Sequence, residues 1–145
     1  MDELKLIARI AGQEVALPAQ AIESVVEVDA ITRVPLAAPH VAGLAALRSR
    51  VLTIIDTYAA LELGQCARDG VLQAIVVTID HHLYGLLVDE VVDVAAIAGD
   101  AEPLHAGLAR GWAQAALGLV EHEGRALLLL DPARIVAGPS LVAAA

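Results

Sequence analysis

Apolar residues alternate with polar ones, or form short apolar runs, along most of the chain. The stretch Ile7–Val28, IARIAGQEVALPAQAIESVVEV, contains an alternating segment, the polar turn AGQ, a second apolar segment, a break, and a short apolar–acidic segment. Alternation on both sides of a two- or three-residue polar turn is typical of a β-hairpin. The pattern therefore predicts a hairpin followed by a third short strand.

The same order of segments occurs twice. Val76–Val94 repeats the first stretch with the turn DHH, and VVDV at Val91–Val94 answers VVEV at Val25–Val28 if the first copy carries an insertion of about three residues. Further along, GLAALRSRVLTIID at Gly43–Asp56 matches GLVEHEGRALLLLD at Gly118–Asp131 without a gap. We interpret the chain as a tandem duplication.

An aspartate closes each copy of the second segment. Asp131 precedes Pro132, and Asp is favoured at a helix cap while Pro is favoured at the first helical position. We expect Asp131 to cap a short helix ending at Gly138. By the same argument, Asp56 caps a helix that ends at Gly64.

This pattern predicts an all-β fold with two small lobes. Each repeat supplies about five short strands and a short helix, which favours a pair of five-stranded barrels. We place the first barrel at about residues 12–66 and the second at about 71–138, within one domain of 1–145; an exchange of terminal segments between the barrels stays open. A groove between the packed lobes is expected.

Composition narrows the function classes. The chain has 145 residues, of which 58% are hydrophobic, but no apolar run approaches the roughly 18 residues of a spanning helix, so we expect no membrane insertion. A net charge of −9 with scattered Lys and Arg argues against a nucleic-acid partner. A single cysteine, Cys66, excludes an internal disulfide, and the N-terminus carries no secretory pattern, so we expect a cytoplasmic protein.

The duplicated aspartates permit an enzymatic interpretation. Two pseudo-symmetric lobes could bring Asp56 and Asp131 together as a proton-sharing dyad, as in the aspartic proteases, whose Asp-Thr-Gly the segment IIDTYAA partly matches. Tyr58, however, occupies the place of the glycine, and the second copy reads DPA. Helix capping accounts for both carboxylates. We therefore expect no catalytic residues, and a two-lobed hydrolase is the alternative.

No cofactor or metal site is indicated. The histidines lack metal-ligand spacing with carboxylates or a thiol: His40, His81, His82, His105 and His122.

The remaining candidates lie at the surface. Arg48 in the first copy corresponds to Glu123 in the second, so the lobes differ in charge at an equivalent point; Arg48 is either a solvated or salt-bridged turn residue or an orienting arginine for a partner. In VVEV and VVDV, alternation places one valine inward and the next outward. Outward valines would line a groove for an apolar helix, and the alternative is that all of these valines are core.

The ordered set of these segments resembles the CheW family of chemotaxis adaptors over about Leu4 to Gly138. The matching features are a Val-x-Glu-Val strand, a Pro before Ala-Pro, a Gly before Leu-Arg, a strand ending in Ile-Asp, and a Gly-to-Val-Asp hairpin. They occur at Val25–Val28, Pro35 with Ala38-Pro39, Gly43 with Leu47-Arg48, Ile54–Asp56, and Gly85–Val91. The chain departs from the family pattern at Ser49, where a glycine is usual, and at Thr53, where a proline is usual.

The resemblance implies two intertwined five-stranded SH3-like barrels and a scaffold function. The protein would couple the cytoplasmic tip of a chemoreceptor, in membrane-associated arrays, to the regulatory domain of the histidine kinase CheA. The kinase would bind on the first barrel. A related possibility is an adaptor of a non-flagellar signalling array.

The resemblance also implies site residues. A receptor helix would dock in the groove between the lobes, lined by Val25, Val91 and Val94 with Glu27 beside them. Glu27 and Arg48 match family positions connected with receptor and array function, and Gly43 matches a family glycine in the same region.

Overall fold

Within residues 3–66, 70–97, 102–103 and 108–139, which the computed structural model describes, the chain forms short strands and a few short helices. The strands are β1 (Glu3–Ile10), β2 (Gln13–Pro18), β3 (Ile22–Val28), β4 (Val41–Leu47), β5 (Arg50–Ile55), β6 (Leu72–Ile79), β7 (His82–Val88), β8 (Glu90–Ile97), β9 (Ala116–His122) and β10 (Arg125–Leu130). The helices are the 3-10 turn η1 (Ala19–Ala21) and the α-helices α1 (Thr57–Ala60), α2 (Arg110–Ala115) and α3 (Pro132–Ala137). No described helix is long and apolar enough to cross a bilayer.

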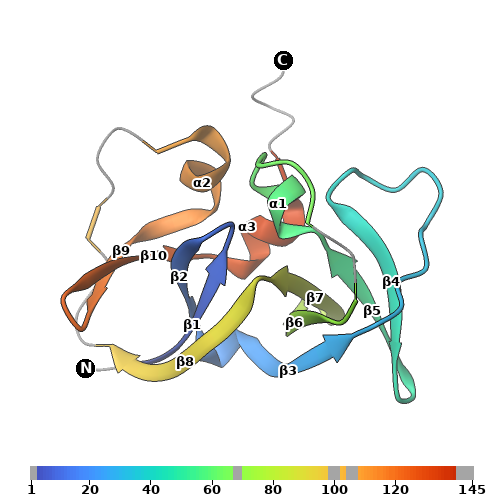
Figure 1. Ribbon diagram of the computed structural model, residues 1–145, viewed down its shortest axis with the longest axis horizontal. Helices are drawn as coiled ribbons and strands as arrows, with labels where there is room; N and C mark the ends of the chain where they lie inside the picture. Colours follow the sequence, from blue (N-terminus) through green and yellow to red (C-terminus); the bar gives the residue numbers. More distant parts are fainter. Residues whose placement is uncertain (1–2, 67–69, 98–101, 104–107, 140–145) are drawn as a thin grey trace.

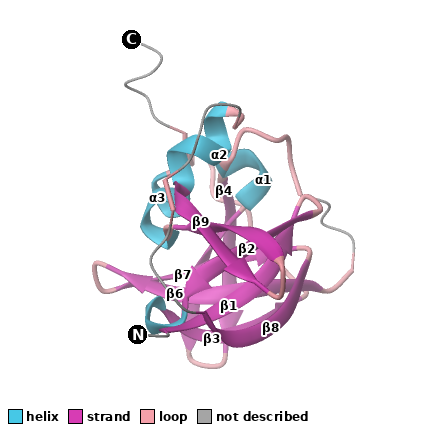
Figure 2. Cartoon of the chain, turned by 90° about the vertical axis from the view of Figure 1, so that its left-hand side faces the viewer, coloured by secondary structure: helices cyan, strands magenta, loops and turns pink. Residues whose placement is uncertain are grey.

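The strands form two five-stranded sheets that lie side by side (Figure 1). We call the sheet with strand order β8-β1-β2-β10-β9 sheet I and the sheet with order β3-β6-β7-β5-β4 sheet II. The α-helices gather at one side of the molecule, whereas β3 and β8 lie on the opposite side (Figures 1 and 2). The expected all-β fold of two five-stranded subdomains with short helices is confirmed.

The sheets exchange strands between the two sequence repeats. The hairpin β1–β2 of the first repeat joins β8, β9 and β10 in sheet I, and the hairpin β6–β7 of the second repeat joins β3, β4 and β5 in sheet II. Parallel pairing makes both joins: Val15 lies opposite Leu128, and Ile54 lies opposite Gly85. The two subdomains are therefore intertwined, and each sheet is the pseudo-symmetric copy of the other.

Three apolar clusters follow from this arrangement. One lies inside sheet I and includes Ile7 and Leu127, and a second lies inside sheet II and includes Leu52 and Ile54. The largest joins the two sheets and includes Leu6, Leu17, Ile75 and Leu86, all nearly free of solvent contact. Because alternate side chains of a strand point to opposite faces, β1 and β6 each contribute to the core of their own sheet and to the core between the sheets.

The register of the third strand of each repeat differs from the sequence prediction. Strands β3 and β8 have matching burial patterns if Ile22 is equivalent to Val91, Val25 to Val94, and Val28 to Ile97. The alignment of VVEV with VVDV, and the insertion it required, were therefore wrong. Both are edge strands with several exposed positions, so similar letters could be matched in more than one register.

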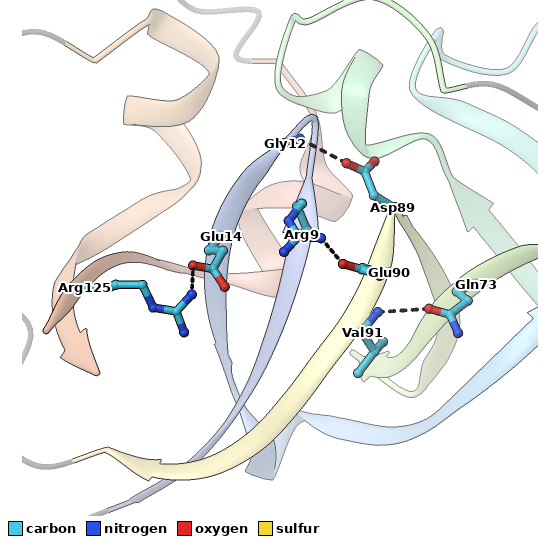
Figure 3. A network of polar contacts seen from close by, with 8 residues as sticks. All are labelled: Arg9, Gly12, Glu14, Gln73, Asp89, Glu90, Val91 and Arg125. Carbon is cyan, nitrogen blue, oxygen red and sulfur yellow. Dashed lines mark hydrogen bonds and ion pairs between the residues drawn. The ribbon is translucent and has the colours of Figure 1, made fainter. Parts of the chain in front are cut away.

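Polar contacts join the sheets where the chain crosses from one to the other. Asp89 is the single residue between β7 in sheet II and β8 in sheet I. One carboxylate oxygen accepts from the Gly12 N–H at 3.0 Å, as Figure 3 shows, and the other accepts from the Tyr58 hydroxyl at 2.5 Å. The Asp89 N–H donates to the Arg9 carbonyl at 2.8 Å. Asp89 thus links the β1–β2 turn of sheet I to α1, the helix that follows strand β5 of sheet II.

Neighbouring residues add to this connection (Figure 3). Glu90 pairs with Arg9, and the Val91 N–H donates to the side-chain oxygen of Gln73 at 2.9 Å. Within sheet I, Arg125 of β10 pairs with Glu14 of β2. The β7–β8 crossing is therefore fixed by side chains from both sheets.

We expect the Tyr58–Asp89 contact to make stability fall at alkaline pH. The hydrogen bond to Asp89, together with burial and the Asp89 charge, raises the pKa of Tyr58 to about 12. The phenol of an unfolded chain has a pKa of about 10, so this contact stabilises the fold fully below pH ~10 and is lost as pH rises toward 12. Urea unfolding of wild type and Tyr58→Phe between pH 8 and pH 11.5 measures the effect. The phenylalanine variant should lose less stability over this range, and parallel losses in both proteins would contradict the expectation.

Candidate functional site

Two equivalent valines lie where the core between the sheets reaches the surface. Val25 of β3 is 39% exposed and lies opposite the buried Ile75, and Val94 of β8 is 51% exposed and lies opposite the buried Leu6. Ile75 and Leu6 both belong to the cluster between the sheets. Since paired residues share a face, Val25 and Val94 lie on the faces that the sheets turn toward each other. Both are exposed, so they lie at the margin of the core between the sheets.

The third predicted groove residue lies deeper. Val91 is half-buried and packs against the core between the sheets, and its N–H is held by Gln73. Its equivalent, Ile22, also packs against that core. The structure therefore places Val25 and Val94 at the surface and Val91 at the margin of the core.

Acidic residues border these valines on β3 and β8. Glu27 shares the face of Val25, is exposed, and forms no hydrogen bond or ion pair with any described residue. Glu23, by contrast, pairs with Arg50 at 2.7 Å and accepts from the Thr78 hydroxyl at 2.8 Å; these hydrogen bonds hold the pKa of Glu23 below its usual value. Asp93 accepts from the Val94 N–H at 2.8 Å. Glu27 is thus a carboxylate next to Val25 that is available to a partner.

Arg48 lies at the tip of the β4–β5 hairpin in a two-residue turn between Leu47 and Arg50. Arg48 has a φ of 56°, whereas Ser49 is not among the residues with positive φ. A positive φ at the first turn residue alone is the type II′ pattern; the equivalent turn, with Glu123 at 51° and Gly124 at 77°, has the type I′ pattern. The serine at position 49 is therefore accommodated by a different turn.

The Arg48 side chain points to solvent at the hairpin tip. It is exposed and forms no hydrogen bond or ion pair with any residue that the structure describes. Its equivalent Glu123 lies 3.9 Å from His122 and is also exposed. The two hairpin tips therefore present opposite charges at equivalent places, and no salt bridge within the described part of the chain accounts for Arg48.

Gly43 acts through its backbone. It has a φ of 149°, and a Cβ at this position would lie 2.2 Å from the Thr32 carbonyl oxygen. Thr32 and Leu44 exchange two backbone hydrogen bonds of 2.8 Å beside it. Gly43 therefore lets the segment that follows β3 cross β4 at contact distance.

The two aspartates lie at helix N-termini. Asp56 is fully buried, and its carboxylate accepts from the N–H groups of Ala59 and Cys66 at 3.1 Å. Asp131 is partly exposed, accepts from the Ala133 N–H at 3.0 Å, and lies 3.6 Å from Arg134. Helix α3 ends before Gly138 as predicted, whereas α1 ends at Ala60 because Glu62 takes a φ of 60°. Each carboxylate is thus used by amides of its own segment.

Cys66 is held beside the buried Asp56. Burial, followed by the hydrogen bond to Asp56, raises the pKa of the thiol to about 12. Since the thiolate is the reactive form, the raised pKa lowers the reactivity of Cys66 at neutral pH.

Metal-ligating side chains do not converge in the described part of the chain, where no group of three His, Cys, Asp or Glu could hold an ion. His40 is buried, and its Nε2 lies 2.8 Å from the Val136 carbonyl oxygen. His81 and His82 are exposed at the β6–β7 turn, and His105 lies outside the described residues. His40 therefore joins the end of α3 to Asp56, the residue before α1, through its ring and its carbonyl group.

Comparisons with known proteins agree with this architecture. The family model of the CheW-like domain matches residues 5–139. The crystal structure of scaffolding protein TtCheW from Thermoanaerobacter tengcongensis superposes with a TM-score of 0.78, at 21% sequence identity over 90% of each chain. At this identity the likeness shows the fold, including its SH3-like subdomains. A search of curated proteins gives no match.

Proposed function

Because the chain belongs to the family of CheW-like domains, we propose that it is a non-enzymatic adaptor that couples a chemoreceptor tip to the histidine kinase CheA. The similar structure is that of a scaffolding protein, which supports this proposal. The adaptor would work in the cytoplasm at membrane-associated receptor arrays. It would require no cofactor and bind no nucleic acid.

The observation that carries the proposal is the equivalent exposure of Val25 and Val94. Both continue the core between the sheets onto the surface, and Glu27 lies beside Val25 as a carboxylate that pairs with none of the described residues. We call Val25 and Val94 together the apolar strip. An apolar strip with the Glu27 carboxylate at its border fits one face of an amphipathic receptor helix. Val91 would support this strip from the core, and Arg48 would orient a partner at the end of β4, with Gly43 fixing the backbone beside it.

The mechanism would be geometric. The core between the sheets and the contacts of Asp89 hold the two subdomains in one arrangement. A receptor bound at the apolar strip and a kinase bound on sheet II would therefore keep a fixed distance and orientation relative to each other. A shift of the receptor could then change the equilibrium of the kinase through this coupling.

We expect Val94→Lys to weaken binding of a receptor-tip fragment by at least about tenfold, because the substitution places a charge in the apolar strip. Leu117→Lys is the matched control, since Leu117 is 45% exposed and lies at the start of β9, directly after α2, whereas β3 and β8 lie on the side of the molecule opposite the α-helices. Isothermal titration of both variants, with circular dichroism to verify folding, measures the effect. Equal affinities in the two variants would reject the groove, and failure of the wild type to bind either receptor tip or CheA regulatory domain would reject the adaptor function.

A further inference from the structure

The chain crosses between the sheets twice, at equivalent points of the two repeats. The first crossing is η1, between β2 of sheet I and β3 of sheet II, and the second is Asp89, between β7 of sheet II and β8 of sheet I. Pro18, just before η1, lies opposite Lys5 of β1. Glu90, just after the second crossing, lies opposite Arg9 of the same strand. Four residues of a strand span about 13 Å, so the crossings lie toward opposite ends of β1.

The second crossing is held by bonds to both sheets. The Asp89 carboxylate accepts from the Gly12 N–H, in the β1–β2 turn of sheet I, at 3.0 Å (Figure 3). Its other oxygen accepts at 2.5 Å from the hydroxyl of Tyr58, which follows strand β5 of sheet II. The Asp89 N–H donates to the Arg9 carbonyl group at 2.8 Å. Because this crossing is a single residue, only two backbone dihedral angles can change here, and the three bonds restrain both.

The first crossing has far fewer restraints from the described residues. No residue of η1 is buried, and no side chain caps this turn. Gln20 is its one polar residue and forms no hydrogen bond with any described residue. A hollow of about 410 Å³ lies beside η1 and is lined by Glu3, Leu4, Pro18, Ala19 and Gln20. The first crossing is therefore loosely packed against sheet I.

The core between the sheets does not determine their angle by itself. The buried side chains that the structure describes there are all aliphatic. Apolar burial has no preferred direction, and packed layers can slide by small amounts without separating. The ion pair of Arg110 with Glu62 reaches solvent, where such pairs contribute little. His40 bonds α3, whereas Asp89 bonds the β1–β2 hairpin itself, so the angle depends mainly on Asp89.

We propose that Asp89 is the positioning residue of the adaptor, which sets the angle between the two subdomains and with it the angle between receptor and kinase. This proposal rests on the adaptor function proposed above. Without the Asp89 carboxylate, the subdomains would rotate and open at η1, the short helix that lies on the side of β3, away from the α-helices (Figure 2). Both partners could still bind, but a shift of one would no longer be passed to the other.

The first experiment measures the angle in the protein alone. Residual dipolar couplings of the backbone amides give the orientation of sheet I relative to sheet II. The angle in Asp89→Ala should differ from that of wild type, and relaxation dispersion should show new exchange on the μs–ms timescale at Gln20 and Ile22. Asp93→Ala is the matched control, since Asp93 is an exposed acid of β8 whose carboxylate accepts from the Val94 N–H of its own strand. It should match wild type in both measurements.

Two milder variants separate positioning from stability. Asp89→Asn should behave like wild type, because its amide oxygen can accept from Gly12 and its NH₂ group can donate to the Tyr58 oxygen. Tyr58→Phe removes one of the two carboxylate contacts and should give an intermediate angle. Urea unfolding verifies that each variant is folded, and Tyr58→Phe carries the test if Asp89→Ala does not fold.

The second experiment measures coupling between the partners. Isothermal titration gives the affinity for the CheA regulatory domain with and without a saturating receptor-tip fragment, and the ratio of these affinities is the coupling factor. Asp89→Ala should bring this factor to about one. Its affinity for the kinase domain alone should equal that of wild type, since the kinase would bind on sheet II only.

The outcomes separate this proposal from the adaptor function. If Asp89→Ala keeps the angle or the coupling factor of wild type, or if Asp93→Ala changes both as strongly, Asp89 is not the positioning residue and the adaptor function stands. The same conclusion follows if wild type binds both partners without coupling between them. If wild type binds neither kinase domain nor receptor tip, both proposals fail.

Discussion

Replacing Gly43 with alanine is expected to lower the free energy of unfolding by about 3 kcal/mol or more. The new Cβ would lie 2.2 Å from the Thr32 carbonyl oxygen and 2.8 Å from Cγ2 of Ile31. Since the first of these is a backbone atom, rotating a side chain cannot remove the clash. The loop must move away from β4, which breaks the two hydrogen bonds between Thr32 and Leu44. Urea unfolding followed by circular dichroism measures the loss.

Gly124→Ala is the matched control for this substitution. Gly124 also has a positive φ, of 77°, but nothing lies within 4 Å of an added Cβ. Its replacement should therefore cost only the backbone strain, about 1 kcal/mol. Equal losses at the two positions would show that contact with Thr32 does not explain Gly43. A large loss at position 43 would also mean that a functional defect of a Gly43 variant reflects folding.

Asp56→Ala should destabilise the protein much more than Asp131→Ala. The buried Asp56 carboxylate accepts from the N–H groups of Ala59 and Cys66, and removing it leaves two partly buried donors unpaired, at a cost of about 3 kcal/mol. Asp131 is partly exposed, so water can replace it and the loss should be near the ~1 kcal/mol of an ordinary helix cap. Thermal unfolding measured by calorimetry compares the two variants.

A second measurement distinguishes the capping role from the alternative of an aspartate dyad. The Asp56 carboxylate contributes to the raised pKa of Cys66, so the thiol of Asp56→Ala should react faster with a disulfide reagent at pH 8. Asp131→Ala should leave that rate unchanged. Equal losses of stability together with an unchanged thiol would contradict the capping role. Hydrolytic activity that both substitutions abolish would favour the dyad.

The fold was predictable because the same order of strand, turn and helix-cap signals occurs in both repeats. Alternation and polar turns located the strands in each copy, and the aspartate before Pro132 located the start of α3 in the second copy. Helix α2 had no such signal, because its six residues RGWAQA are too few for an amphipathic period and lack a side-chain cap. Its position depends on Gly111, where a Cβ would lie 1.7 Å from the Leu61 carbonyl oxygen. Such a contact is visible only in three dimensions.

The candidate surface was predictable in part. Arg48 was a candidate because the two repeats differ in charge at this point, whereas Val25 and Val94 were expected from the resemblance to the CheW family; the structure exposes all three side chains. The register between β3 and β8 was wrong because exposed edge strands carry a weak burial pattern. The turn at Leu36 was not recognised. Proline followed by a residue with positive φ is the type II pattern, but the sequence does not show that Leu36 has a positive φ.

The exchange of hairpins between the sheets has a mechanical consequence. Sheet II is completed by β6 and β7, and sheet I by β1 and β2, so neither half of the chain encloses a whole sheet. A force between a partner on sheet I and a partner on sheet II passes through the chain where it crosses between the sheets, from β2 to β3 and from β7 to β8, and the parallel pairs β2–β10 and β5–β7 hold each exchanged hairpin in its sheet. The two subdomains can therefore separate only if strands are pulled out of the sheets. A displacement at one end of the protein would be transmitted to the other end.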